Sequence, residues 1–198
     1  MLLKRIMDVA ISAALLILLS PLFLIIAIAV ILDSGLPVFF SQVRVGCNFR
    51  LFRIYKFRSM RTTGTGLPIT VKGDVRITRT GRFLRASKLD ELPQLWNVLT
   101  GDMSLVGPRP ELPEYVEHFR SRYERILHLR PGITDLASLP YRNEEAILAA
   151  SPDPLNAYRE QILPAKLDLA EEYAARRTFW LDVTILAQTV CGIFREPG

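Results

Sequence analysis

The first 35 residues carry the strongest hydrophobic pattern in this chain. Val9 to Leu32 is an uncharged run of 24 residues, long enough as a helix to cross a bilayer. A cleaved signal peptide is disfavoured, because the run is longer than a typical signal core and residues 33–37 (DSGLP) make a poor cleavage site. The pattern therefore predicts a membrane segment over residues 1–35.

Two features of this segment bear on its path. Ser20 and Pro21 fall in its middle, and proline removes a backbone donor and clashes with the preceding turn. Each half then has about eleven residues, roughly 16 Å of helix and about half of the apolar thickness. Lys4 and Arg5 precede the run and Arg44 and further basic residues follow it, and positive charge marks the cytoplasmic side. A re-entrant helix keeps both flanks inside, whereas a kinked spanning helix, the alternative, places one outside.

The remainder, residues 36–198, is predicted to be a small α+β domain that is mostly helical. Apolar and basic residues alternate over 51–57, which predicts a half-buried strand, and residues 38–40 predict a second short strand. Residues 62–68 are rich in turn formers and predict a loop. Residues 69–80 predict a further short pair of strands.

Helical periodicity dominates the second half of the chain. Apolar residues at helical spacing predict helices over 89–99, 112–127, 157–163 and 166–177. Gly101 is expected to end the first of these helices. The tail from 179 to 194 is apolar but interrupted by polar residues, which predicts an amphipathic helix in the membrane interface.

Charge is concentrated in one stretch of a chain whose net charge is +5. From Arg44 to Lys88 there are twelve Lys or Arg residues and one acid, Asp74. A run this one-sided beside an apolar segment favours an anion-binding surface near a membrane over a merely solvated face.

The sequence offers no other ligand class. Cys47 and Cys191 lack CxxC spacing, and the two histidines are isolated, so neither a disulfide framework nor a His/Cys metal site is predicted. Aromatic RNA-binding motifs and zinc spacings are also absent from the sequence, and no nucleic-acid partner is expected.

Asp90 and Glu91 are the candidate reactive groups. Pro93 belongs in a first helical turn, so the pair is expected at a helix N-terminus. Acids are favoured there for the helix dipole alone. Here they follow Arg85 and Lys88, and arginines with a helix N-terminus suit a phosphate. Carboxylates in such a site either attack phosphorus or hold Mg²⁺ together with substrate phosphates.

Basic residues on rigid turns complete the candidate site. Arg109 lies between two prolines in Gly107–Pro110, and residues 130–134 (RPGIT) form another rigid turn. Each arginine could equally face solvent. Together they predict one anionic site, whose candidate phosphate ligands are Lys56, Arg58, Arg85, Arg109 and Arg142.

In this order, the motifs resemble those of the monotopic phosphoglycosyl transferases, also called bacterial sugar transferases. The matching pieces are Lys4-Arg5 with Asp8, Ser20-Pro21, YKFRSM (55–60), LDELPQLWNVLTGDMSLVGPRPE (89–111) and RPGIT (130–134). The resemblance covers nearly the whole chain and implies a re-entrant membrane helix bent at Ser20-Pro21. It implies a monotopic protein on the cytoplasmic face of the bacterial inner membrane.

The resemblance also implies an activity. Asp90 would attack the β-phosphate of a UDP-sugar, release UMP and carry the phosphosugar until polyprenyl (undecaprenyl) phosphate accepts it. This is the first membrane step of glycoconjugate assembly, as in exopolysaccharide biosynthesis. Mg²⁺ is the implied cofactor, held by Asp90 and Glu91, with Arg85 and Arg109 on the phosphates. Arg142 is a softer inference, because its surroundings diverge. The implied partners are the UDP-sugar, the lipid acceptor and membrane lipids, and a homodimer stays open.

Two points limit this transfer. Many relatives have Gly-Trp-Ala-Gln after the PGIT motif, whereas this chain has residues 135–138 (DLAS), so the identity of the sugar does not carry over. The chain is expected to be a minimal catalytic unit. The alternative is a membrane-anchored basic module that binds anions without catalysis, which explains the charge run but not the Asp90-Glu91 pair.

Overall fold

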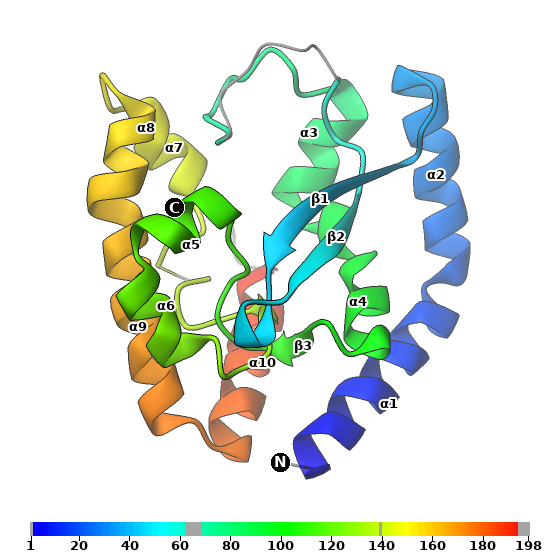
Figure 1. Cartoon of the computed structure of the whole chain (residues 1–198). Helices are drawn as coiled ribbons and strands as arrows, with labels where there is room; N and C mark the ends of the chain where they lie inside the picture. Colours follow the sequence, from blue (N-terminus) through cyan, green and yellow to red (C-terminus); the bar gives the residue numbers. More distant parts are fainter. Residues whose placement is uncertain (1, 62–68, 139, 194–198) are drawn as a thin grey trace.

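The computed structural model describes residues 2–61, 69–138 and 140–193, and the loop predicted over 62–68 lies outside them. The chain folds as α+β and is mostly helical, as predicted, with small two-stranded sheets in the described residues. Figure 1 shows a long bent helix pair on one side, a strand hairpin in the middle and a second group of helices on the other side.

The bent pair consists of α1 (Leu2–Leu18) and α2 (Ser20–Ser34), whose axes differ by 61°. The bend falls where it was predicted, because Pro21 in the first turn of α2 has no N–H for the α1 ladder. The Ser20 hydroxyl instead donates to the Ile17 carbonyl at 2.8 Å. Among the described helices, none alone is long and apolar enough to cross a membrane. The bent pair together has the length and composition of a broken span or a re-entrant loop.

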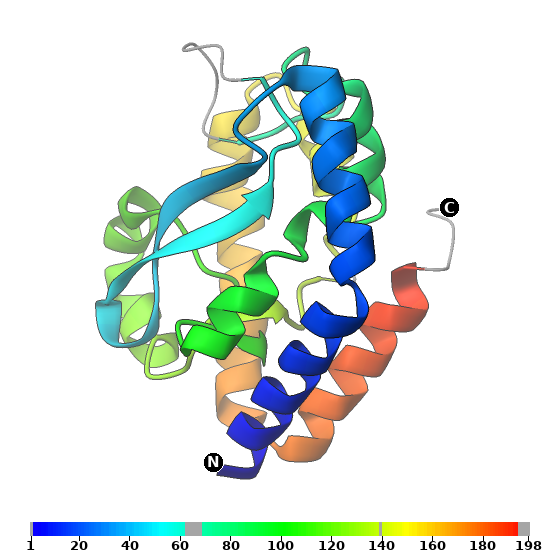
Figure 2. The same cartoon turned by 90° about the vertical axis from the view of Figure 1, so that its right-hand side faces the viewer.

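Helix α1 presents its polar residues to the protein and its apolar residues outward. Lys4, Asp8 and Ser12, spaced by four, are buried. The large apolar side chains exposed on α1 and α2 are Leu2, Leu3, Ile6, Ile11, Ile17, Leu18, Leu24, Ile25, Ile28, Ile31 and Leu32. Both helices run along the side that faces the viewer in Figure 2, with α10 beside α1. We call this exposed set the apolar face.

The hairpin pairs β1 (Phe39–Val45) with β2 (Leu51–Phe57) in antiparallel register, Phe39 opposite Phe57. The strand predicted over 51–57 is confirmed, with Arg53 on its exposed face. The strand pair predicted over 69–80 is wrong, because its described residues contribute only an isolated bridge. Asp74 accepts a hydrogen bond from the Arg76 N–H at 2.9 Å, and this local turn competes with a strand ladder.

The segment between the hairpin and β3 carries the Asp-Glu pair between two helices. Helix α3 (Arg79–Ala86) is capped by Thr78, whose hydroxyl accepts from the Gly81 N–H at 2.9 Å. A 3₁₀ turn (Leu89–Glu91) follows, and α4 (Gln94–Thr100) ends at Gly101, where φ is +96°. The single helix predicted from residue 89 is therefore wrong at its start.

Two short parallel strands, β3 (Ser104–Val106) and β4 (Gly132–Thr134), lie behind α4. Gly107 and Gly132 let them approach closely. A Cβ at Gly132 would lie 2.1 Å from the Gly107 nitrogen, so a larger residue does not fit. This close packing fixes the backbone that leads from β3 into the Pro108–Pro110 turn.

The remaining helices form the second group. Their bounds are α5 (Pro113–His118), α6 (Arg120–Ile126), α7 (Glu144–Ala149), α8 (Pro154–Ala157), α9 (Leu163–Arg176) and α10 (Phe179–Ile193). The helix predicted over 112–127 is broken at Phe119, whereas the two predicted over 157–177 are joined by a π-helical stretch, Tyr158–Ile162. The predicted C-terminal helix is confirmed as α10.

Candidate active site

The Asp90-Glu91 pair occupies the 3₁₀ turn between α3 and α4. Lys88, just before it, adopts a left-handed conformation with φ of +58°. Such backbone is costly for a residue with a side chain and is concentrated at functional sites. The pair thus lies on a strained turn that begins where α3 ends, and not at the N-terminus of an α-helix as predicted.

Glu91 is held between two cations. Its Oε1 accepts from Lys56 Nζ at 2.6 Å and from Arg109 Nη2 at 2.9 Å. Lys56 comes from β2 and Arg109 from the loop after β3, so the Glu91 carboxylate joins both sheets. Burial alone would raise the pKa of Glu91, but Lys56 and Arg109 outweigh it and hold the pKa well below its usual range. Lys56 and Arg109 therefore favour the ionised form of Glu91.

Asp90 has a different environment. It is 4% exposed, and its Oδ1 is buried without a hydrogen-bond partner among the described residues. Burial raises the pKa of Asp90, and the nearby Lys56 opposes that rise. An unpartnered buried carboxylate oxygen is costly, and in an enzyme such a group is often reserved for a ligand or for reaction.

Arg85 approaches the pair from the last turn of α3. Its charge lowers the pKa of Asp90, as does that of Lys88, which shows that both cations act on this carboxylate. The Arg85 guanidinium also forms an ion pair with Glu145 at the start of α7. The structure thus brings Lys56 and Arg109 into contact with Glu91, whereas the side-chain contacts of Arg85 are to Glu145 and Met60, and the predicted phosphate contacts of all three stay predictions.

Arg58 and Arg142 lie elsewhere. The buried Arg58 guanidinium donates to the Ser34 carbonyl at 2.9 Å and to the Leu36 carbonyl at 2.8 Å, at the end of α2. Arg142 donates to the Gly192 carbonyl near the end of α10. The predicted phosphate contacts of these two arginines stay untested. Arg58 contacts carbonyl groups at the end of α2, and no hydrogen bond joins it to Asp90 or Glu91 in the described structure.

The carboxylates fit a magnesium ion that also binds substrate. Glu91 Oε2 and Asp90 Oδ1 both lack a hydrogen-bond partner within the described chain, and Mg²⁺ takes one or two carboxylates with substrate phosphates. No cluster of three or more His, Cys, Asp or Glu residues able to hold a metal occurs in the described ranges. The pair is therefore suited to a metal that arrives with a phosphate ligand.

Three supporting residues escaped the sequence reasoning. Asn97 is fully buried, and its side chain accepts from the Tyr55 N–H at 3.2 Å and donates to the Arg53 carbonyl at 2.8 Å. It thereby fixes α4 against β2 next to the site. The available signal was a polar residue inside an apolar helical stripe. Lys88 was identified only as part of the basic run, and Gln94, buried with an unpartnered Nε2, gave no signal.

A buried carboxylate oxygen without a partner, close to cationic side chains, forms a site suited to a phosphorylated ligand, on a protein with an exposed apolar face. Comparison with known proteins specifies the family. The model of the family described as "Bacterial sugar transferase" matches residues 1–196, and the chain belongs to this family.

Individual relatives agree with this assignment. The chain is 39% identical over 196 residues to the UDP-glucose:undecaprenyl-phosphate glucose-1-phosphate transferase of Klebsiella pneumoniae, covering 96% of this chain and 40% of that protein. It is 38% identical over 200 residues to the UDP-N-acetylgalactosamine-undecaprenyl-phosphate N-acetylgalactosaminephosphotransferase of Aeromonas hydrophila, covering 98% and 44%. A sugar transferase of Bacillus subtilis, uncharacterized by its name, is 38% identical over 198 residues, covering 100% and 90%. The chain thus spans less than half of the length of the first two relatives.

Proposed function

We propose that this protein transfers a sugar phosphate from a UDP-sugar to undecaprenyl phosphate and releases UMP. The observation that carries the proposal is Asp90, a buried carboxylate with an unpartnered oxygen, next to Lys56 and Arg85. The names of the Klebsiella and Aeromonas relatives support both the donor class and the acceptor.

In the first step, an Asp90 oxygen attacks the β-phosphorus of the UDP-sugar. The new bond joins Asp90 to phosphorus, and the bond between this phosphorus and the bridging oxygen breaks, so that UMP leaves with both electrons. Anionic attack on a diphosphate needs neutralising charge. Lys56, Arg85 and Arg109 provide it, and Mg²⁺ held by Asp90 and Glu91 would further neutralise the phosphate oxygens when bound.

In the second step, an oxygen of undecaprenyl phosphate attacks the same phosphorus. The Asp90–phosphorus bond breaks, the carboxylate is restored, and the lipid diphosphate sugar is formed. Glu91 stays ionised throughout and holds Lys56 and Arg109 in place through Oε1. Because these charges are already in place, the site needs little reorganisation when the transition state forms.

The acceptor is a membrane lipid, and we place residues 1–35 in the membrane as a re-entrant segment. The support is the arrangement of α1, in which Lys4, Asp8 and Ser12 face the protein while the apolar face is exposed. A contiguous exposed apolar surface is rare on soluble monomers and marks a contact with another protein or a membrane. Residues 36–198 then form the catalytic part on the cytoplasmic face, close to the lipid acceptor, which favours the reaction by proximity.

Residues 135–138, which differ from the Gly-Trp-Ala-Gln of many relatives, are candidates for selecting the sugar of the donor. Asp135 lines a small cavity together with Arg109 and Lys166. Since Arg109 is a proposed phosphate ligand, this segment lies close to the donor. We therefore expect residues 135–138 to influence which UDP-sugar is accepted.

The test is UMP release from a panel of UDP-sugars, with undecaprenyl phosphate and Mg²⁺ in nanodiscs. Asp90→Asn should release no UMP and gain no mass, whereas the wild type should carry a phosphosugar when acceptor is withheld. Asp102→Asn, which alters an exposed carboxylate just after α4, is the matched control and should behave as the wild type. Undiminished UMP release by Asp90→Asn would exclude Asp90 as the nucleophile.

Mg²⁺ removal by a chelator should stop both half-reactions.

Absence of UMP release with every donor would favour the second candidate, an anchored module that binds anions without catalysis. The basic run from Arg44 to Lys88 supports that candidate. It leaves the unpartnered Asp90 oxygen without a role.

A further inference from the structure

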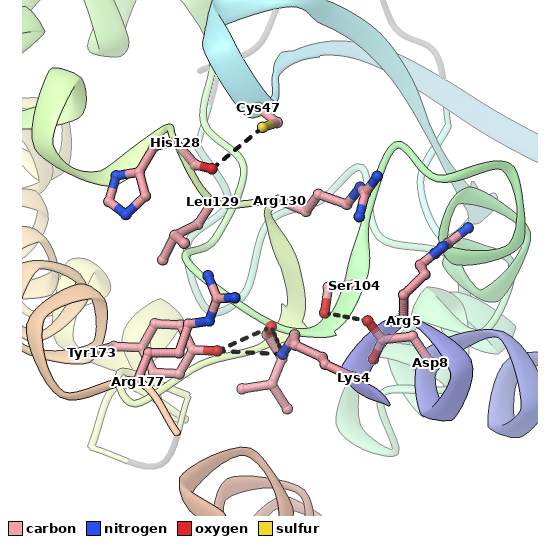
Figure 3. A pocket seen from close by; sticks show the side chains of 11 residues that line it. Lys4, Arg5, Asp8, Cys47, Ser104, His128, Leu129, Arg130, Tyr173 and Arg177 are labelled. Carbon is pink, nitrogen blue, oxygen red and sulfur yellow. Dashed lines mark hydrogen bonds between the residues drawn. The ribbon is translucent and has the colours of Figure 1, made fainter. Parts of the chain in front are cut away.

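One cavity of the described structure is not lined by the Asp-Glu pair. It has a volume of about 290 Å³ and lies where the start of α1, the strand β3, the segment after α6 and the α9–α10 link meet (Figure 3). A volume of this size is near the lower end of small-molecule sites, roughly 300–1,000 Å³. The cavity can therefore hold a group larger than a few water molecules.

Positive charge dominates the walls of this cavity. Four cationic side chains line it, Lys4, Arg5, Arg130 and Arg177, together with one carboxylate, Asp8. They come from separate segments that only folding brings together, as Figure 3 shows. A hollow lined by one sign of charge concentrates the electrostatic potential and attracts ions of the opposite sign.

Two of these cations, Lys4 and Arg5, already donate hydrogen bonds to other groups of the protein. Lys4 donates to Asp182 Oδ2 and, at 2.9 Å, to the Val106 carbonyl. Arg5 donates to the Val98 carbonyl at 2.7 Å and the Leu99 carbonyl at 3.1 Å, at the end of α4. Their positions are thus fixed, and their charges contribute to the potential without being available for several new bonds.

Arg130 differs from them. Its Nε donates to the Gly101 carbonyl at 2.9 Å, while its two terminal nitrogens have no hydrogen-bond partner among the described residues. The guanidinium is therefore anchored at one edge and keeps the fork that matches two phosphate oxygens. Arg177 lines the same cavity from the α9–α10 link.

The one carboxylate in the cavity lining, Asp8, repels a bound anion only weakly. Asp8 Oδ2 accepts from the Ser104 hydroxyl at 2.7 Å, and Oδ1 accepts from the Leu105 N–H at 3.3 Å. Both oxygens are thus directed at β3. The Tyr173 and Ser104 hydroxyls in the walls already donate to Asp182 and Asp8, so the donors left for an anion are the cationic side chains.

Exposed apolar side chains occur close in sequence to residues that line the cavity, and they indicate the kind of anion. Leu2 and Leu3 precede Lys4 on α1 and are 79% and 62% exposed, and Trp180 lies three residues after Arg177, near the start of α10, and is 75% exposed. A ligand with an anionic head and apolar chains would satisfy both surfaces. A membrane phosphoglyceride has this composition.

We propose that this cavity binds the phosphate group of an anionic phospholipid headgroup, at a site separate from Asp90 and Glu91. The phosphate contacts are Arg130 and Arg177, and Lys4 and Arg5 supply the surrounding positive potential. The lipid source of the phosphate rests on the membrane position proposed above. The bound lipid would hold the start of α1 and the start of α10 at the same depth in the interface.

The test is equilibrium binding of short-chain phosphatidylglycerol to the whole protein in detergent, by calorimetry. Short-chain phosphatidylcholine, which has no net charge, and glycerol phosphate, which has no chains, are the comparison ligands. The double variant Arg130→Gln/Arg177→Gln should weaken phosphatidylglycerol binding by at least about a hundredfold, since it removes both phosphate contacts and each hydrogen bond to a charged group contributes about 1.5–3 kcal/mol, or about tenfold or more. Arg130→Lys should lose less.

Controls separate this site from the catalytic one. Arg125→Gln removes an exposed arginine outside the cavity and should leave binding unchanged. Asp90→Asn should lose UMP release but keep phosphatidylglycerol binding. Unfolding midpoints of all variants establish that the chain is intact.

The binding experiment has three possible results, and each supports or overturns the lipid site. Binding that is selective for phosphatidylglycerol and lost in the double variant supports the lipid site. Equal affinity for glycerol phosphate, with the same dependence on the two arginines, supports the phosphate site but assigns it to a soluble phosphate ester. Phosphatidylglycerol binding that the double variant does not weaken, or that phosphatidylcholine equals, overturns the proposal.

Discussion

At the scale of single residues, the two adjacent carboxylates have opposite pKa shifts because their surroundings differ. Glu91 has two cations on one oxygen, and its pKa is held well below the usual range. Asp90 is buried, has an unpartnered oxygen, and its pKa is raised above the ordinary value. One carboxylate is therefore held as a fixed anion, and the other is the one we propose to react.

The pH dependence of the reaction should follow Asp90. A carboxylate attacks only when ionised, so kcat/KM should fall as the pH drops through the raised pKa of Asp90 in the free enzyme. Lys56 lowers this pKa, and Lys56→Met removes that influence. The acid limb of the kcat/KM profile should therefore move to higher pH in Lys56→Met.

The matched control for this prediction is Lys56→Arg, which keeps the charge and should leave the acid limb near its wild-type position. UMP release measured across the acid range gives both profiles. An acid limb that stays in place in Lys56→Met would show that another group sets it.

At the scale of elements, a few polar groups connect the end of α2 to the proposed catalytic part. Arg58 follows β2 and donates to carbonyls at the end of α2, including that of Ser34 at 2.9 Å. Asp33 accepts from the Thr80 N–H at 2.6 Å, in the first turn of α3. Since α3 leads directly to the Asp-Glu turn, these bonds connect the proposed membrane helix to the site.

Arg58→Ala should destabilise the protein and slow the reaction. It leaves part-buried carbonyls at the end of α2 without these donors, and each lost hydrogen bond to a charged group costs about 1.5–3 kcal/mol. The expected loss of unfolding free energy is at least about 2 kcal/mol, measured by denaturation in detergent. Arg53→Ala, at an exposed position of the same hairpin, is the control and should lose little. Wild-type stability with a raised KM would instead support a phosphate contact of Arg58.

The break between α1 and α2 gives a second prediction at this scale. Pro21→Ala restores an N–H, so the two helices can join into one of 33 residues, roughly 50 Å long and longer than the apolar thickness of about 30 Å. In place of returning, the joined helix should span the membrane and move the N-terminus to the far side.

Labelling distinguishes the two paths. A cysteine at Leu2, in a Cys47→Ser/Cys191→Ser background, should react with an impermeant maleimide added outside cells only when Pro21→Ala is present. Leu22→Ala is the control for a neighbouring substitution and should remain unlabelled. Equal labelling with and without Pro21 would refute the re-entrant path.

At the scale of the whole molecule, the two ends of the described chain are joined by buried charges. Lys4 of α1 forms an ion pair with Asp182 of α10, whose side chain is fully buried. The Tyr173 hydroxyl of α9 also donates to Asp182, at 2.5 Å. The first and last helices thus close against each other, and the proposed lipid cavity depends on this closure.

Removing one partner of this pair should be severe. Lys4→Met leaves the Asp182 charge buried and uncompensated, which costs about 3–5 kcal/mol when a buried ion pair is broken. Lys4→Met/Asp182→Leu removes both charges and should recover most of that loss. Thermal unfolding of the wild type and both variants in the same detergent measures this. A double variant as unstable as Lys4→Met would show that closure needs the charges themselves.

Much of the fold was readable from local pattern. Strand β2, the end of α4 at Gly101 and the bend near Pro21 follow from side-chain alternation, from a left-handed glycine and from a missing N–H. These are properties of a few consecutive residues. The strand pair over 69–80 and the single helix over 112–127 failed, because Asp74 closes a local turn and the chain breaks at Phe119.

The sequence by itself determined the family, the order of the motifs, and the Asp90-Glu91 pair with Lys56, Arg85 and Arg109 as its candidate partners. Only the tertiary structure decided that Arg58 caps the end of α2, that Glu91 is the clamped carboxylate, and that Lys4 and Arg177 share a cavity with Arg130. The physical reason is distance along the chain. Local pattern sets backbone conformation, whereas burial, charge pairing and pKa depend on residues that meet only after folding.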